Sequence, residues 1–145
     1  MGKGDGILSA QLNPAPTNFT DRERASNRSV LGLFDAISNG IDDTAMPTFN
    51  QLTELQRWSL AFYVGGLAFQ SKPMPAANDL KISLSQLVNF SPAQIAVGQS
   101  NEAENLAEWL RAHPEQLFDK QQNPLAISRE RLKSAHIAYQ KGDYE

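Results

Sequence analysis

One methionine of this chain stands in a polar turn rather than in an apolar segment. Residues 40–49 read GIDDTAMPTF, so Met46 follows glycine, aspartate and threonine residues and directly precedes Pro47. Most methionines of soluble proteins fill hydrophobic cores, and these neighbours are not typical of a core. A thioether that a turn holds at a fixed point is a soft, weak ligand for a transition metal. Met46 is therefore the first candidate metal ligand.

The other residue types that carry chemistry give little support for catalysis. The chain has no cysteine, which excludes disulfides, thiolate zinc sites and cysteine nucleophiles. His113 and His136 are the only histidines, and neither has a metal-ligating residue three or four positions further on. Asp42 and Asp43 alone supply too few ligands for an iron site, and GKGDG lacks the spacing of a nucleotide-binding loop. Because no nucleophile and base pair up, we predict that the protein is not an enzyme.

Composition limits the size, the partners and the membrane topology of the protein. With 145 residues, of which 41% are hydrophobic, the chain has the size of one packed domain with an extension. Its formal charge of −3 is spread over both halves, so no basic face is expected and nucleic acid is not a predicted partner. The apolar stretch at residues 58–69 is shorter than the ~20 residues that cross a bilayer. No part of this chain is predicted to span a membrane.

The elements that position Met46 are predicted to be two helices. Residues 1–26 are rich in glycine, proline and asparagine and are predicted to form an ordered loop. An apolar stripe predicts a helix over residues 29–39, with Gly40 as its left-handed C-terminal cap. The capping-box pattern TELQ opens a second helix over residues 53–69, whose aromatic residues we assign to the core. Met46 is thus expected in the connection between the two helices.

The second half of the chain is predicted to consist of short helices. A proline-containing linker covers residues 71–79. Predicted helices follow at residues 83–89, from Ser91-Pro92 onward, from Asn101 to the residue before His113, and from Asn123-Pro124 to the C-terminal region. No segment alternates as a strand would, so the predicted fold class is all-α.

The order of these motifs resembles a known family. The series GKGDG, NPAPTNF, a helix ending in ISNG, TAMPTF and LTELQRWSLAFYV is similar to a class I cytochrome c downstream of its haem-attachment motif. More narrowly, it resembles the periplasmic cytochrome c-like N-terminal region of bacterial high-affinity iron permeases. The segments ISLSQLVNFSPAQIA, LAEWLRAHPEQLF and ISRERLKSAHIAYQKGDYE look like the helices that lead to the membrane part of that family.

The resemblance implies a fold and a division of the chain. We expect truncated class I cytochrome c-like helices and loops followed by a short helical extension. Residues 1–71 would be the cytochrome c-like remnant, residues 72–122 a linker region of short helices, and residues 123–145 a helix leading toward the permease domain.

The resemblance also implies a site and a function. Met46 would be the axial ligand of a haem c iron, Pro14 and Pro16 would line the haem, and Arg28 would pair with a haem propionate. The implied function is electron transfer coupled to oxidation of ferrous iron before uptake. The protein would lie in the periplasm, tethered to the inner membrane. Its partner would be the membrane permease domain of the same polypeptide, and it would handle ferrous and ferric iron only indirectly.

The chain departs from the family in two ways. The CxxCH motif is missing, and so is the glutamate-containing motif of the permease helices, which resembles REGLE. The resemblance therefore implies a fragment, which we expect to be free of haem as it stands. The last helix of a class I cytochrome packs on an N-terminal helix that is absent here, so we predict a homodimer or exchanged helices. The alternative hypothesis is a helical interaction or scaffold domain without a cofactor, in which Met46 fills a gap.

Overall fold

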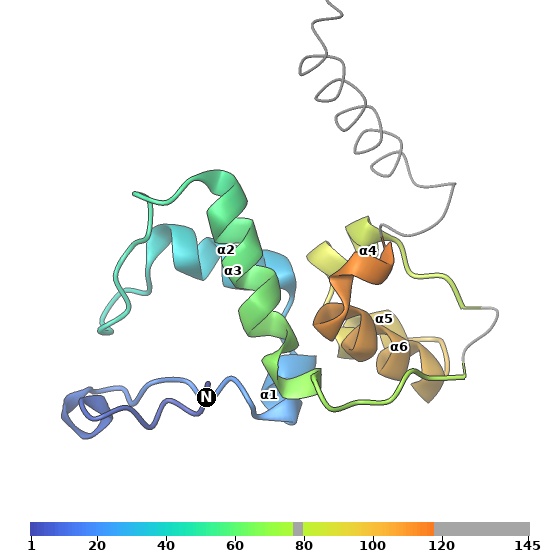
Figure 1. Cartoon of the computed structure of the whole chain (residues 1–145), viewed down its shortest axis with the longest axis horizontal. Coiled ribbons are helices and arrows are strands. Elements are labelled where there is room, and N and C mark those ends of the chain that lie inside the picture. Colours follow the sequence, from blue (N-terminus) through green and yellow to red (C-terminus); the bar gives the residue numbers. More distant parts are fainter. Residues whose placement is uncertain (77–79, 118–145) are drawn as a thin grey trace, which may run out of the picture. The chain divides into compact units, whose positions relative to one another are not determined.

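The computed structural model describes residues 1–76 and 80–117, and it shows helices and loops with no strand among these residues (Figure 1). The all-α prediction is confirmed for this part of the chain. The α-helices are α1 (Arg22–Ser26), α2 (Val30–Asn39), α3 (Glu54–Gly66), α4 (Leu84–Asn89), α5 (Pro92–Ala96) and α6 (Asn101–Ala112). The 3-10 helices are η1 (Ser9–Gln11), η2 (Leu67–Phe69) and η3 (Pro114–Leu117).

Side-chain caps start the helices where the sequence predicts them. The hydroxyl of Thr53 accepts a hydrogen bond from the Gln56 N–H, and the Gln56 side chain accepts one from the Thr53 N–H, which completes the capping box of α3. The same reciprocal pair opens α4 and α5, at Ser83/Gln86 and Ser91/Gln94. The helices predicted over residues 29–39, 83–89 and 101–112 are confirmed. The one predicted over residues 53–69 consists of α3 followed by η2.

One α-helix was not predicted. Residues 22–26 form α1 inside the segment that the sequence assigned to a loop, so that assignment is wrong for these residues. The Asp21 carboxylate accepts a hydrogen bond from the Arg24 N–H at 3.1 Å and caps α1. Five residues are too few to show a helical hydrophobic period, which is why the turn-rich composition of the segment dominated the prediction.

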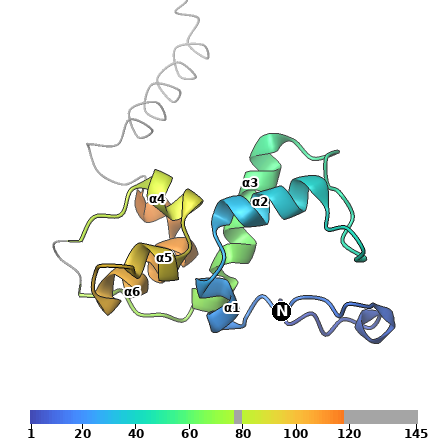
Figure 2. The same ribbon diagram turned by 180° about the vertical axis from the view of Figure 1, so that it is seen from behind.

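The core of the first half lies between α2 and α3, which run beside each other in Figures 1 and 2. We name as the α2–α3 core the cluster of buried residues Val30, Leu33, Ile37 and Ala61. The rings of Phe34 and Trp58 stack with their centroids 3.9 Å apart. Among the aromatic residues of α3 and η2 that were predicted to be core residues, Phe69 is buried, and Trp58 and Phe62 are partly buried against the α2–α3 core. Tyr63 is the exception, because half of its surface is exposed.

The helices of the second half join the same compact unit. Helix α6 packs on α3 and on α5, and its residues Leu106, Trp109 and Leu110 are buried as predicted. The unit covers Met1–His113, and a second unit begins at Pro114. The boundary predicted after residue 71 thus falls inside the first unit, and residues 72–113 are not separate from it. The helix predicted over residues 123–145 and the residue His136 lie outside the described residues.

Candidate functional site

The turn that carries Met46 is fixed by its own main chain. The Ile41 N–H donates to the Met46 carbonyl at 3.2 Å, and the Met46 N–H donates to the Thr44 hydroxyl at 3.1 Å. Gly40 ends α2 with φ +73° and ψ −170°, a conformation that glycine adopts easily. A Cβ on Gly40 would lie 2.8 Å from the Met46 carbonyl oxygen, so the turn leaves no room for a side chain there. Gly40 has the positive φ predicted for it, but its ψ is extended, so it is not the left-handed helical cap that the sequence predicts.

The side chain of Met46 lies at the edge of the α2–α3 core. It is partly buried and packs against that core beside partly buried aromatic residues, namely Phe34, Phe49, Trp58 and Phe62. The scaffold hypothesis expects this packing. The hydrogen bonds of the turn fix the main chain at Met46.

The predicted proline loop lies against the N-terminal glycine turn. Pro14 is exposed and follows a cis peptide bond, while Pro16 is partly buried. The Phe19 N–H donates to the Gly2 carbonyl at 2.7 Å, and a Cβ on Gly4 would lie 2.7 Å from the Pro16 carbonyl oxygen. In both ribbon views this N-terminal loop and the Met46 loop extend from α2 and α3 toward the same side (Figures 1 and 2).

The start of the chain lies beside α3. The Tyr63 hydroxyl donates to the sulfur of Met1 at 3.3 Å, although both residues are exposed.

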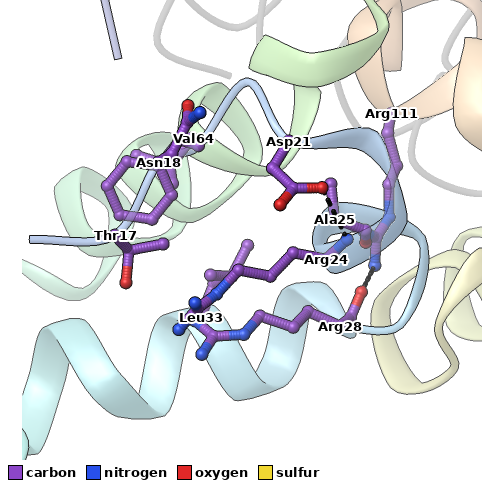
Figure 3. A pocket seen from close by; sticks show the side chains of 11 residues that line it. Thr17, Asn18, Asp21, Arg24, Ala25, Arg28, Leu33, Val64 and Arg111 are labelled. Carbon is purple, nitrogen blue, oxygen red and sulfur yellow. Dashed lines mark hydrogen bonds between the residues drawn. The ribbon is translucent and has the colours of Figure 1, made fainter. Parts of the chain in front are cut away.

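Arg28 lines a small pocket that we name the arginine pocket (Figure 3). The pocket has a volume of about 20 Å³ and is lined by the loop at residues 17–19, by Asp21, Arg24, Ala25, Arg28, Leu33, Val64, Gly65 and Arg111. Burial lowers the pKa of Arg28, and the positive charge of Arg24 lowers it further. Among the described residues the ion pairs involve Arg22 and Lys72, not Arg24 or Arg28.

Arg111 forms the inner wall of this pocket. Its guanidinium donates to the Ala25 carbonyl at 3.1 Å and to the Arg28 carbonyl, so it satisfies acceptors at and after the end of α1 (Figure 3). Only 1% of Arg111 is exposed. Burial lowers its pKa to about 10, while the nearby Glu108 carboxylate acts in the opposite direction. Arg111 is thus a buried cation that fixes the path of the chain from α1 into α2.

Sequence reasoning missed a buried carboxylate, Glu108 of α6. The side chain is fully buried and accepts hydrogen bonds from the Ser26 hydroxyl, from the Arg22 guanidinium at 3.1–3.3 Å, and from Lys72. Lys72 also donates to the Asn105 side chain at 2.8 Å. Burial by itself raises the pKa of Glu108, but the hydrogen bonds from Lys72, Ser26 and Arg22 outweigh it and lower the pKa. The network connects α1, the segment after η2, and α6.

The remaining candidate residues have structural positions. His113 stacks on Trp109 with ring centroids 4.5 Å apart, and its Nδ1 lies 3.0 Å from the Trp109 carbonyl oxygen. Asp42 and Asp43 are exposed in the turn before Met46. In the described ranges no three acidic, histidine or cysteine residues are grouped to hold a metal ion. No helix in the described part of the chain has the length and apolar character needed to cross a membrane.

Comparison of the chain with family models, with curated proteins and with solved structures gave no match. The function is accordingly argued from the residues and their geometry.

Proposed function

We propose that this chain is the part of a haem c electron-transfer module that carries the axial methionine, Met46, and that the module serves an iron permease. The observation that carries the proposal is the Met46 turn. Three features support it: a glycine that no other residue can replace without a clash, hydrogen bonds to both main-chain polar groups of Met46, and aromatic side chains that pack on the same core as Met46.

Four features of the described chain support this proposal. Met46 supplies the thioether, the aromatic residues of the α2–α3 core supply an apolar wall, and Pro16 belongs to the loop on the same side. Arg28 supplies a guanidinium that pairs with no carboxylate among the described residues. A bound haem would supply one-electron transfer, with a potential that methionine ligation raises. Its second ligand and covalent links would come from a preceding segment, which would enter beside Tyr63.

The link to iron uptake rests on the resemblance in motif order. In this proposal the module lies in the periplasm, held at the inner membrane by the permease domain of the same polypeptide. It receives the electron when ferrous iron is oxidised and does not bind the iron that is transported. The role of the chain is to hold the sulfur of Met46 in place and to exclude water from its inner side.

The test is to express the protein together with its native upstream sequence and with the machinery for haem attachment. We expect a low-spin c-type spectrum with the weak absorption of thioether-to-iron ligation. Met46→Ala should abolish that absorption, whereas Met74→Ala, at an exposed methionine outside the turn, should leave it unchanged. A colourless protein would contradict the cytochrome assignment.

The packing of Met46 on the α2–α3 core favours a second candidate function, a helical scaffold without a cofactor. In that case Met46→Leu, which conserves the volume, would keep both stability and partner binding. The two functions differ clearly in the longer protein. A scaffold stays colourless whatever residue stands at position 46.

A further inference from the structure

The arginine pocket brings two positive charges together without a negative charge between them. Figure 3 shows the side chains of Arg24 and Arg28 running alongside each other toward α2, with their guanidinium groups adjacent. Like charges at this separation repel, and partial burial of Arg28 adds to the cost. An anion bound between the two groups would remove this cost.

The acidic residue of the pocket is engaged elsewhere. The carboxylate of Asp21 accepts the hydrogen bond from the Arg24 main-chain N–H and caps α1, and it turns away from the guanidinium groups in Figure 3. Glu108 is also committed, because it accepts hydrogen bonds from Ser26, Arg22 and Lys72. The buried Arg111 adds a third cation to the wall, and its Nε has no hydrogen-bond partner among the described residues.

The size of the pocket selects the kind of ligand. A volume of about 20 Å³ holds little more than one water-sized group, so a whole organic molecule does not fit. Asn18, Asp21 and Arg24 are exposed and mark the mouth of the pocket. A carboxylate at the end of a short arm therefore fits, with the rest of the ligand outside. Arginine is suited to this role because its planar group donates parallel hydrogen bonds to both carboxylate oxygens.

We propose that Arg24 and Arg28 together form a binding site for one carboxylate arm, with Arg111 as the buried cation behind it. The family resemblance implies Arg28 alone, and the structure places the guanidinium of Arg24 beside it. If the arm is a haem propionate, the inference rests on the proposed function. If the arm belongs to a free small acid, it does not.

The experiment uses the chain as it is, with two probes. The first is propionate, titrated into labelled protein while the side-chain N–H signals of the arginines are followed by NMR. The second is a short haem-bearing peptide, compared with the same peptide after esterification of both propionates. Each probe is tested on the wild-type protein, on Arg24→Gln and Arg28→Gln, and on Lys81→Gln as a control for charge at an exposed position.

We expect propionate to shift the Arg24 and Arg28 signals, and either arginine substitution to weaken binding by about tenfold. Lys81→Gln should bind as the wild type does. If the arm belongs to the cofactor, the free-acid peptide should also bind more tightly than its ester, and both arginine substitutions should remove that difference.

Two results separate failure of this inference from failure of the proposed function. Arginine signals that do not respond to propionate, together with equal affinity for the peptide and its ester, would overturn the carboxylate site. A haem peptide that does not bind in either form counts against the proposed function alone. The propionate titration then decides the inference, with a response upholding it and no response overturning it.

Discussion

The buried carboxylate of Glu108 connects segments of the chain that are far apart in the sequence. A buried carboxylate is favourable only while its hydrogen-bond donors are present, and removing one partner of a buried ion pair exposes the cost of burying the other. Here the donors come from α1 and from the segment after η2, so the carboxylate binds α6 to both.

We predict that Glu108→Gln lowers the free energy of unfolding by roughly 3 kcal/mol, because Lys72 and Arg22 lose their shared anion. Glu102→Gln, at an exposed position in the first turn of the same helix, should change it by less than about 0.5 kcal/mol. Urea unfolding of the three proteins provides the measurement. Equal midpoints for the two variants would show that the network adds nothing to stability.

The lowered pKa of Glu108 predicts how stability depends on pH. A carboxyl group with a lower pKa in the folded protein stabilises it above the ordinary value of 4.5, and this contribution is lost as pH falls through the folded-state pKa. Unfolding midpoints should therefore fall steeply on acidification below about pH 4.5. The slope should be shallower in Glu108→Gln, and an identical slope would contradict the assignment.

The sequence identified some of these residues and missed others for a clear reason. Met46 was identified because its unusual neighbours are adjacent in the chain. Glu108 was missed because its partners Ser26 and Arg22 are 82 and 86 residues away. One local clue existed: Glu108 lies among apolar residues on the inward face of its helix, where a charge needs a partner.

At the scale of elements, local signals predicted the helix starts well. Capping boxes involve residues three positions apart, so they can be read directly from the chain at residues 53–56, 83–86 and 91–94. The five-residue helix α1 was not predicted because Arg111, whose side chain donates to the Ala25 carbonyl of α1 and to the Arg28 carbonyl after it, lies more than 80 residues away.

The connection between α2 and α3 gives a prediction about Gly40. Gly40→Ala should destabilise the protein by roughly 2–4 kcal/mol, because it combines an unfavourable positive φ with a clash against the main chain of residues 46–48. Gly98→Ala is a control that matches Gly40 in φ. Its φ is +76°, but a Cβ there meets open space, so it measures the cost of the backbone conformation alone, about 1–2 kcal/mol.

Thermal unfolding of both variants gives the comparison. The excess loss in Gly40→Ala measures how tightly the Met46 turn is built. If both substitutions cost the same, the turn adjusts freely, and the claim that it fixes the thioether of Met46 fails.

At the scale of the whole molecule, the class of fold could be predicted but the packing of the two halves could not. Helical periodicity and the lack of alternating strands predict an all-α protein. The proline-containing segment after residue 71 is typical of a domain boundary, yet α6 packs on α3 across it. Contacts between distant helices depend on matching surfaces, which a single sequence does not display.

The exposed apolar residues of α3 support the prediction of a homodimer. Leu55 and Tyr63 are 76% and 51% exposed, and in the proposed function a preceding segment would cover this side. We expect light scattering to show a concentration-dependent dimer that Leu55→Glu weakens and Val97→Glu, at a position 79% exposed after α5, does not. The protein with its native upstream sequence should be a monomer. A clean monomer of the present chain at high concentration would contradict this prediction.

The contact between α3 and α6 determines whether Gly66→Ala raises or lowers the free energy of unfolding. Gly66 is helical, with φ −92°, so in an isolated helix Gly66→Ala would stabilise by up to about 1 kcal/mol. Here a Cβ would lie 2.7 Å from the Arg111 carbonyl oxygen and 3.1 Å from the Ala112 Cα, and main-chain atoms cannot rotate away. We therefore expect a net loss of roughly 1–2 kcal/mol in urea unfolding. Gly32→Ala in α2, where the neighbouring atom is the Ser29 hydroxyl at 3.3 Å, should instead stabilise slightly. A stabilising effect of Gly66→Ala would mean that the main chain of α6 does not lie against Gly66 of α3 in solution.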